Sequence, residues 1–377
     1  MADKTGIEWT DATWNPIAGC SVVSPGCANC YAMAMAARIE RMNAGDRQRG
    51  PRMRDGEMQD VPLTHYAGLT QPSKAGPVWT GKVVQAPEHI LTQPLRWKKP
   101  RRIFVNSMSD LFHDSVPDEW IDRVFRVINM APQHTFQILT KRARRMRQYM
   151  SDPERSIHVA FEGRGVWPPR NAWLGVTAED QTRADERIPD LLATPAAKRF
   201  VSCEPLLSHI DLTNIEINGD AIFDVRATRT CGPRVGCDAL APLSWQELWD
   251  QYWSPETTGV PLDEAIEGYC YEGGVYPPTG AKPPSLDWVI AGGESGPNAR
   301  PMHPVWPRFL RDQCEAAGVP FFFKQHGEWL WTGDDNGEVS FARHALFEFS
   351  NGASLYRVGK RRAGSLLDGV EHKEFPR

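Results

Sequence analysis

Short apolar runs bounded by turn residues recur along this chain, and most are followed by a segment with helical spacing. The clearest runs cover residues 102–107, 136–140, 173–177, 199–202, 288–291 and 319–323. Helices are predicted over 117–130, 141–150, 179–192 and 305–317. Strands that alternate with helices indicate a parallel sheet whose two faces are both covered.

Weaker signals add a first strand within 8–17, a strand over 78–84 and a short helix over 87–97. Two segments rich in Gly and Pro, 44–78 and 213–285, interrupt the pattern and are predicted to be insertions outside the core. Without them about 270 residues remain, close to the size of a (β/α)8 barrel with its eight strands.

We therefore predict the α/β class, with a (β/α) barrel of the TIM type over residues 1–330 that carries both insertions. Residues 331–377 are predicted to be an extension packing on the barrel. A doubly wound open sheet is the alternative that periodicity leaves open.

Composition narrows the class of protein. The chain has 377 residues, of which 41% are hydrophobic, and a formal net charge of −4. It shows neither a signal-peptide pattern nor a run of eighteen apolar residues, so we expect a cytoplasmic protein without membrane contact. Three basic clusters, 47–54, 96–102 and 141–147, are suited to phosphate contacts, although such runs are also typical of solvated faces.

Three of the eight cysteines, Cys20, Cys27 and Cys30, lie within eleven residues of each other. Pro and Gly residues between them predict a loop that directs the thiols to one centre, and a helix is predicted from Tyr31. A loop of soft ligands before a helix N-terminus suits an anionic thiolate-bound centre. The clustering favours metal ligation in a reducing compartment over disulfides.

Three thiolates are one short of the four in a closed zinc site or an all-cysteine cluster. The spacing leaves three alternatives open: an iron–sulfur cluster with one open iron, a zinc knuckle completed by a distant Cys or His, or unrelated buried thiols. Cys203 is either the missing ligand or a small buried thiol. Cys231, Cys237 and Cys270 form a second metal site or are free.

Polar side chains follow the predicted strands, where an α/β barrel carries its chemistry. In a barrel they would converge on the mouth from which the cysteine loop emerges. The alternative to a functional site is structural. Polar residues are common in loops because loops face solvent, and Asp110 or Glu179 would then only cap the next helix. The candidate site residues are Ser107, Asp110, Lys141, Glu179, Glu204, Gly292, Gly293, Glu294 and Lys324.

A family resemblance rests on motifs spread over residues 6–330. The motifs are Thr13-Trp14-Asn15-Pro16, the cysteine loop, Asn106-Ser107-Met108-Ser109-Asp110, Leu139-Thr140-Lys141-Arg142, Thr177-Ala178-Glu179-Asp180, Ser202-Cys203-Glu204-Pro205, Gly292-Gly293-Glu294-Ser295-Gly296 and Phe323-Lys324-Gln325. They resemble the phage and prophage three-cysteine-motif protein family, which is itself similar to radical S-adenosylmethionine (SAM) enzymes.

The resemblance implies a [4Fe–4S] cluster on Cys20, Cys27 and Cys30, with SAM on the fourth iron. It implies reductive cleavage of SAM to a 5′-deoxyadenosyl radical, an external electron donor, and a phage or prophage gene expressed in a bacterial host. A nucleic-acid base in phage DNA is the substrate this setting suggests. Because the Cys-x6-Cys-x2-Cys spacing differs from the usual Cys-x3-Cys-x2-Cys, the other site residues rest on their places at strand ends, with Glu204 and Lys324 as catalytic candidates.

Two other functions fit the same sequence. In the first, the cysteines hold zinc or a structural cluster in a nucleic-acid-binding or defence-related phage protein. In the second, Glu204, Glu294 and Lys324 serve a metal-independent hydrolase.

Overall fold

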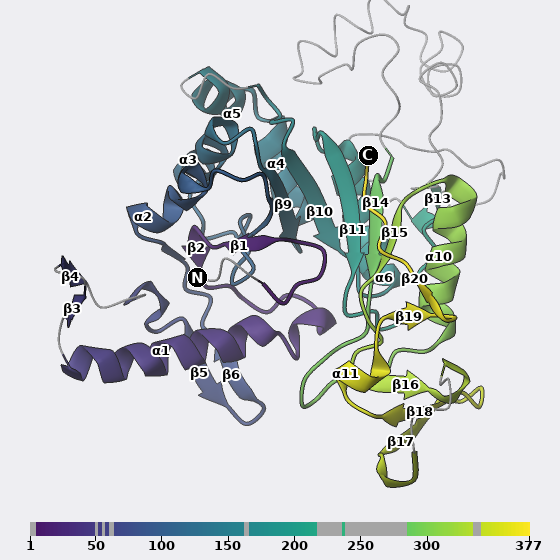
Figure 1. Ribbon diagram of the computed structural model, residues 1–377. Helices are drawn as coiled ribbons and strands as arrows, with labels where there is room; N and C mark the ends of the chain where they lie inside the picture. The colour runs from purple at the N-terminus through teal and green to yellow at the C-terminus, as the bar shows by residue number, and fades with distance from the viewer. Residues whose placement is uncertain are drawn as a thin grey trace, which may run out of the picture. The chain divides into compact units, whose positions relative to one another are not determined.

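The computed structural model describes residues 5–49, 52–54, 57–59, 64–161, 166–216, 236–237, 285–334 and 341–377 (Figure 1). The chain forms two compact units, which we call unit 1 (Met1–Arg145 with Ser156–Trp173) and unit 2 (Met146–Arg155 with Leu174–Arg377). The predicted boundary at residue 330 lies inside unit 2. No helix among the described residues is long and apolar enough to cross a membrane.

Seven strands form the main sheet, in the hydrogen-bonded order β1-β8-β9-β10-β11-β14-β15. They are β1 (Ala12–Trp14), β8 (Arg102–Val105), β9 (Thr135–Thr140), β10 (Ala172–Thr177), β11 (Lys198–Cys203), β14 (Trp288–Ala291) and β15 (Phe321–Phe323). The pairs β1–β8, β8–β9, β11–β14 and β14–β15 are parallel. The α/β class is thus confirmed. Among the described residues β1 and β15 end the strand order, so closure into a barrel is not confirmed.

The remaining elements are helices and short antiparallel pairs. The helices are α1 (Tyr31–Arg49), α2 (Glu88–Leu91), α3 (Asp118–Met130), α4 (Ala143–Ser151), α5 (Pro153–Ser156), α6 (Gln181–Ala193), α10 (Val305–Ala317) and α11 (Lys360–Ala363). The short strands are β2 (Ile17–Ala18), β3 (Arg52–Arg54), β4 (Glu57–Gln59), β5 (Thr70–Ser73), β6 (Gly76–Trp79), β7 (Val84–Gln85), β12 (Ile215–Glu216), β13 (Gly236–Cys237), β16 (Trp329–Trp331), β17 (Leu346–Glu348), β18 (Ser354–Arg357), β19 (Leu366–Leu367) and β20 (Val370–Glu371).

Helix α3 shows why the sequence pattern located the helices well. Pro117 precedes its first residue, and Asp118 and Glu119 lie in its first turn, where negative charge is favourable. Its buried face carries Ile121, Val124, Phe125 and Ile128 at helical spacing.

The prediction that residues 44–78 form an insertion outside the core needs correction. Among its described residues, Tyr66 and Leu69 are buried in an apolar cluster of unit 1 with Met33 and Ala36 of α1. The hairpin β5–β6 lies along α1 in Figure 1. The expectation that this segment stays outside the core is therefore wrong for Tyr66 and Leu69, whose side chains lie in that cluster, whereas residues 71–75 are exposed.

The strand predicted over 78–84 is also corrected. It is divided between β6, which pairs with β5, and β7, which pairs with β2, so neither belongs to the main sheet. The helix predicted over 87–97 is α2 followed by a 3-10 turn, Gln93–Arg96, that contains Pro94.

Unit 2 has its own core around β14, which has parallel neighbours on both sides and four buried residues. Residues of the C-terminal extension pair with β15: the N–H of Phe323 donates to the carbonyl of His372 at 2.9 Å, and Phe322 bridges Lys373. The extension also forms the small sheet β16-β18-β17. Apart from 213–216, 236–237 and 285, the predicted insertion 213–285, with Cys231 and Cys270, lies outside the described residues.

Candidate metal centre and strand-end charged pairs

The three clustered cysteines lie on the loop between β2 and α1 in unit 1. The loop contains a 3-10 turn, Pro25–Cys27, in which the N–H of Cys27 donates to the Ser24 carbonyl at 2.9 Å. The N–H of Cys30 in turn donates to the Cys27 carbonyl at 3.2 Å. Pro25 and Gly26 thus allow two tight turns in succession, and these turns contain Cys27 and Cys30.

Side chains of the β8 carboxyl end hold the cysteine loop in place. The Asn15 Oδ1 accepts from the Ser107 hydroxyl at 3.1 Å and from the Met108 N–H at 3.0 Å. The Ser109 hydroxyl donates to the Ile17 carbonyl at 2.8 Å. Tyr31, the first residue of α1, donates its hydroxyl to the Ser107 carbonyl at 2.8 Å. The structure therefore places the predicted site residue Ser107 beside the cysteine loop.

Gly19 allows Cys20 to approach a second loop. Its φ is +95°, and a Cβ at this position would lie 2.1 Å from the Lys82 carbonyl oxygen. The N–H of Gly81 donates to the Cys20 carbonyl at 3.2 Å. Only glycine fits this close backbone approach without movement.

Each of the three sulfurs has a hydrogen-bonding group of unit 1 beside it. The Arg142 Nη1 lies 3.9 Å from the Cys20 Sγ, and the Ser24 Oγ lies 3.8 Å from the Cys27 Sγ. At Cys30 the backbone of Ala32 and Met33, in the first turn of α1, acts to lower the thiol pKa, although burial outweighs it. Such partners favour thiolates, the form in which cysteine binds metal.

Without a metal the thiols of Cys20 and Cys30 are held in the protonated form. Burial, followed by the charge of Asp110, raises the pKa of Cys20 to about 12, and burial also raises the pKa of Cys30. Metal binding at neutral pH must therefore release protons from these thiols.

Asp110 is a second predicted site residue that the structure places here. Its Oδ1 accepts from the Thr140 hydroxyl at 2.7 Å and the Phe112 N–H at 3.0 Å. Its Oδ2 accepts from the Lys141 N–H at 3.1 Å and the Arg142 Nη1 at 2.9 Å. With four acceptor contacts inside the chain, Asp110 orders the loops around the cysteines.

Arg142, which the sequence showed only as part of a basic cluster, links Asp110 to the cysteine loop. Its Nη2 donates to the Ser21 hydroxyl at 2.7 Å, and the His113 Nε2 lies 3.0 Å from the same hydroxyl. The His113 Nδ1 accepts from the Ser115 N–H at 3.1 Å. Burial, and next the charge of Arg142, lower the pKa of His113, so the ring is neutral near pH 7 and its Nε2 carries the hydrogen.

The other predicted site residues, from Glu179 onward, lie in unit 2. Two of their carboxylates are closed by arginines. Glu179 is fully buried and meets the Arg187 Nη1 at 3.0 Å. Glu294 accepts from the Arg300 Nε at 2.9 Å and the Arg300 Nη2 at 2.6 Å. Asp180, rather than Glu179, caps α6, because its side chain accepts from the Arg183 N–H at 2.9 Å.

The third pair of unit 2 is more open. The Lys324 Nζ lies 3.2 Å from the Glu204 Oε1, and the two side chains are 20% and 14% exposed. The Ser202 hydroxyl lies 3.4 Å from the Glu204 Oε2. A Cβ on Gly292 would lie 2.7 Å from the Glu204 Oε1, so this glycine leaves room for the carboxylate.

Gly293 permits another close approach, because a Cβ there would lie 2.0 Å from the His326 carbonyl oxygen. The structure thus groups Glu204, Gly292, Gly293 and Lys324 at the carboxyl ends of β11, β14 and β15. The convergence of these residues with the cysteine loop on one mouth stays a prediction.

Cys203 is fully buried in unit 2, and burial raises its pKa well above the ordinary value. The charge of Cys314, also fully buried, acts in the same direction. Of the alternatives for Cys203, the structure favours the small buried thiol. The side chains of Cys231, Cys237 and Cys270 are outside the described part of the chain.

No group of three or more His, Cys, Asp or Glu side chains among the described residues is arranged to hold a metal ion. A closed zinc site needs four ligands around one ion. In a [4Fe–4S] cluster each cysteine binds a different iron, so its sulfurs need not converge on one point. Three thiols with polar groups beside them are donors of the kind that an iron–sulfur cluster takes.

A family model described as "Protein of unknown function (DUF5131)" matches residues 4–376. The chain belongs to this DUF5131 family. No curated protein and no solved structure matches the chain.

Three arginines of the basic cluster 141–147 are ion-paired: Arg142 with Asp110, Arg145 with Asp118 and Arg147 with Asp190. Arg144 is exposed. Whether the basic clusters contact nucleic acid stays a prediction.

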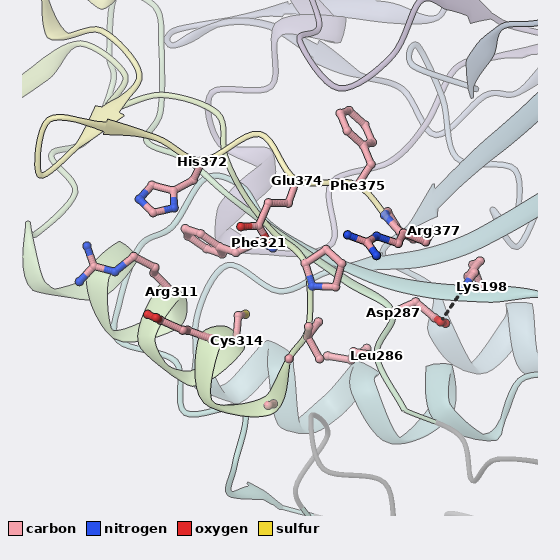
Figure 2. Close-up of a pocket in the computed structure, with 16 residues that line it drawn as sticks. Lys198, Leu286, Asp287, Arg311, Cys314, Phe321, His372, Glu374, Phe375 and Arg377 are labelled. Carbon is pink, nitrogen blue, oxygen red and sulfur yellow. Dashed lines mark hydrogen bonds and ion pairs between the residues drawn. The ribbon is translucent and has the colours of Figure 1, made fainter.

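A cavity of about 1040 Å³ lies in unit 2 (Figure 2). It is lined by Leu286 and Asp287 before β14, Phe321 of β15 and the C-terminal residues, at the amino ends of the strands. Figure 2 shows the ion pair between Lys198 and Asp287 at its edge, 3.1 Å long. None of the predicted site residues lines this cavity.

Proposed function

We propose that the protein is a radical SAM enzyme that holds a [4Fe–4S] cluster through Cys20, Cys27 and Cys30. The observation that carries the proposal is the arrangement of a hydrogen-bonding group beside each of the three sulfurs. Buried thiols that only fill space have no need of such partners, whereas the thiolates of an iron–sulfur cluster are stabilised by them. The family motifs around the loop support the same function.

When bound, the cluster would pass one electron from an external donor to SAM, and the cleavage of SAM would yield a 5′-deoxyadenosyl radical that abstracts a substrate hydrogen. The residues of unit 1 prepare for this. Asn15 and Ser109 fix the cysteine loop to the end of β8, and Gly19 lets Cys20 approach Lys82. The apolar cluster against which Cys20 and Cys30 pack keeps water from one side of the loop.

In unit 2 we propose that Glu204 and Lys324 act at the substrate or the cofactor. Of the three strand-end carboxylates Glu204 is the most exposed, at 14% against 6% for Glu294 and 0% for Glu179. Gly292 also leaves room beside it. Lys324 offers N–H donors, and Glu204 offers carboxylate oxygens suited to an amino group. Glu179 and Glu294 keep their arginines and serve the fold.

For this function we propose a fold of the (β/α) barrel type. The proposed substrate is a nucleic-acid base, as the resemblance to the three-cysteine-motif family implies. A direct check of the substrate class is the salt dependence of binding to DNA, since phosphate contacts weaken steeply as salt is raised. Lys98 and Lys99 of the cluster 96–102 are exposed, so we expect the affinity for DNA to fall as salt is raised. Affinity that is absent or independent of salt would count strongly against a nucleic-acid substrate.

The deciding experiment is anaerobic. The protein is reconstituted with iron and sulfide, reduced with dithionite and mixed with SAM, and 5′-deoxyadenosine is quantified. The proposal predicts product in the wild type, none in Cys27→Ala, and undiminished product in Cys314→Ala, the matched variant of a buried cysteine outside the loop. A reconstituted protein that never cleaves SAM, or a protein that takes up zinc instead, would contradict it.

A further inference from the structure

Arg142 has more contacts than an arginine that only neutralises a carboxylate. Its side chain is 7% exposed. Nη1 is shared between the Asp110 Oδ2 at 2.9 Å and the Cys20 Sγ at 3.9 Å. Nη2 donates to the Ser21 hydroxyl. The guanidinium thus lies between a buried carboxylate and one of the three clustered sulfurs.

The orientation of Arg142 is fixed by groups on two other loops. Asp110 itself is held by Thr140 and by two backbone N–H groups, so it cannot follow the arginine if the arginine moves. The neutral His113 ring donates to the same Ser21 hydroxyl that accepts from Nη2. Asp114, whose carboxylate is 79% exposed, lies 3.6 Å from Nε. Arg142 is therefore held rigidly in this position, with its fork facing Cys20.

We propose that Arg142 is a positioning residue that sets the reduction potential of the cluster on Cys20, Cys27 and Cys30, by placing a fixed positive charge and an N–H donor at the Cys20 sulfur. This inference rests on the proposed function. It adds a role to a residue outside the cysteine motif.

The physical reason is electrostatic. One-electron reduction by an external donor adds one negative charge at the thiolate-bound centre and, in this step, moves no proton. A buried cation and a hydrogen bond to sulfur stabilise the reduced form more than the oxidised form, so they raise the potential. Asp110 opposes part of this effect, and its removal should act in the reverse direction.

The test is a reduction titration of the reconstituted protein, followed by electron paramagnetic resonance, with iron and sulfide measured on each sample. Arg142→Gln removes the charge, and we expect the ratio of reduced to oxidised protein at the wild-type midpoint to fall about tenfold, a shift of about 59 mV for one electron. Arg142→Lys keeps the charge and should lie closer to the wild type. Asp114→Asn should shift the potential slightly upward.

Arg102→Gln is the matched control. It removes the same charge within unit 1, from an arginine paired with Asp11 at 3.1 Å. We expect no shift in this variant. A structural role for Arg142 would lower the cluster content of both Arg142 variants alike and leave the midpoint of the remaining cluster unchanged.

The outcomes separate the two proposals. A wild type that holds no iron and sulfide overturns the proposed function and this inference with it. A loaded protein whose midpoint is the same in the wild type and Arg142→Gln overturns the inference alone. If Arg142→Gln fails to load, Asp114→Asn decides, because its carboxylate is on the surface: an unchanged or lower midpoint in that variant overturns the inference.

Discussion

Unit 1 and unit 2 each pair strand-end carboxylates with cations, but they use the cation differently. In unit 2, Arg187 Nη1 contacts Glu179 and the Thr177 carbonyl, and Arg300 Nε and Nη2 contact Glu294. In unit 1, Arg142 contacts Asp110 and also reaches Cys20 and Ser21. An arginine whose contacts are carboxylate and backbone oxygens stabilises a fold, whereas one with a donor directed at a reactive side chain is a candidate for function.

The largest effect on stability is expected from opening a closed pair of unit 2. Arg187→Met removes the Nη1 donor from the fully buried Glu179 carboxylate. Loss of one partner of a buried pair costs about 3–5 kcal/mol, so we expect the free energy of unfolding in urea to fall by that amount while the iron content is unchanged. Arg183→Met, at a more exposed pair with Asp180, is the control and should cost about 0–1 kcal/mol. Equal losses in the two variants would contradict the distinction.

The next largest effects are expected from two glycines, one in each unit. Gly19→Ala in unit 1 and Gly293→Ala in unit 2 each place a Cβ about 2 Å from a backbone oxygen. We expect each to lower the free energy of unfolding by about 1–3 kcal/mol, and only Gly19→Ala to lower the iron content, because it displaces Cys20. Gly6→Ala, with nothing within 4 Å, should change neither. Iron loss in Gly293→Ala would break the proposed division of roles.

A third prediction is that the folded protein loses stability as the pH falls. Burial, followed by the charge of His89, lowers the pKa of His65 in unit 1 to about 4. The folded state therefore binds this proton less readily than the unfolded state, so its contribution to stability is complete above about pH 6.5 and is lost as the pH falls toward 4. The free energy of unfolding should fall by up to about 1.4 kcal/mol per pH unit in that window.

His65→Phe should remove most of that acid slope. His326 in unit 2 is the comparison: burial lowers its pKa too, and the Leu366 carbonyl and Asp334 partly offset this. We therefore expect His326→Phe to lose part of the acid slope as well. An unchanged slope in His65→Phe would show that another group carries the acid sensitivity.

The sequence predicted the parts of this fold that local patterns determine. The apolar runs located β8, β9, β10, β11, β14 and β15, and the 3.6-residue period located α3, α6 and α10. The hairpin β5–β6 was missed, because Gly and Pro residues near it indicate a surface loop, whereas Tyr66 and Leu69 become buried only against α1.

The candidate site was predictable only where its residues are close together in the chain. The cysteine loop was recognised from spacing, and Ser107 and Asp110 from their place after a strand. Arg142 was not, since its partner Ser21 is 121 residues away and a basic run does not show which arginine is buried. Likewise nothing in the sequence near Glu179 indicates that Arg187 closes it, because that contact depends on how α6 packs.

The most direct test of the account is the iron and sulfide content of the anaerobically reconstituted protein. We predict about four iron and four sulfide per chain in the wild type and in Cys203→Ala, and a large loss in Cys20→Ala, Cys27→Ala and Cys30→Ala. Iron and sulfide retained in all three loop variants, or their absence from the wild type, would contradict the central claim that this loop holds a cluster.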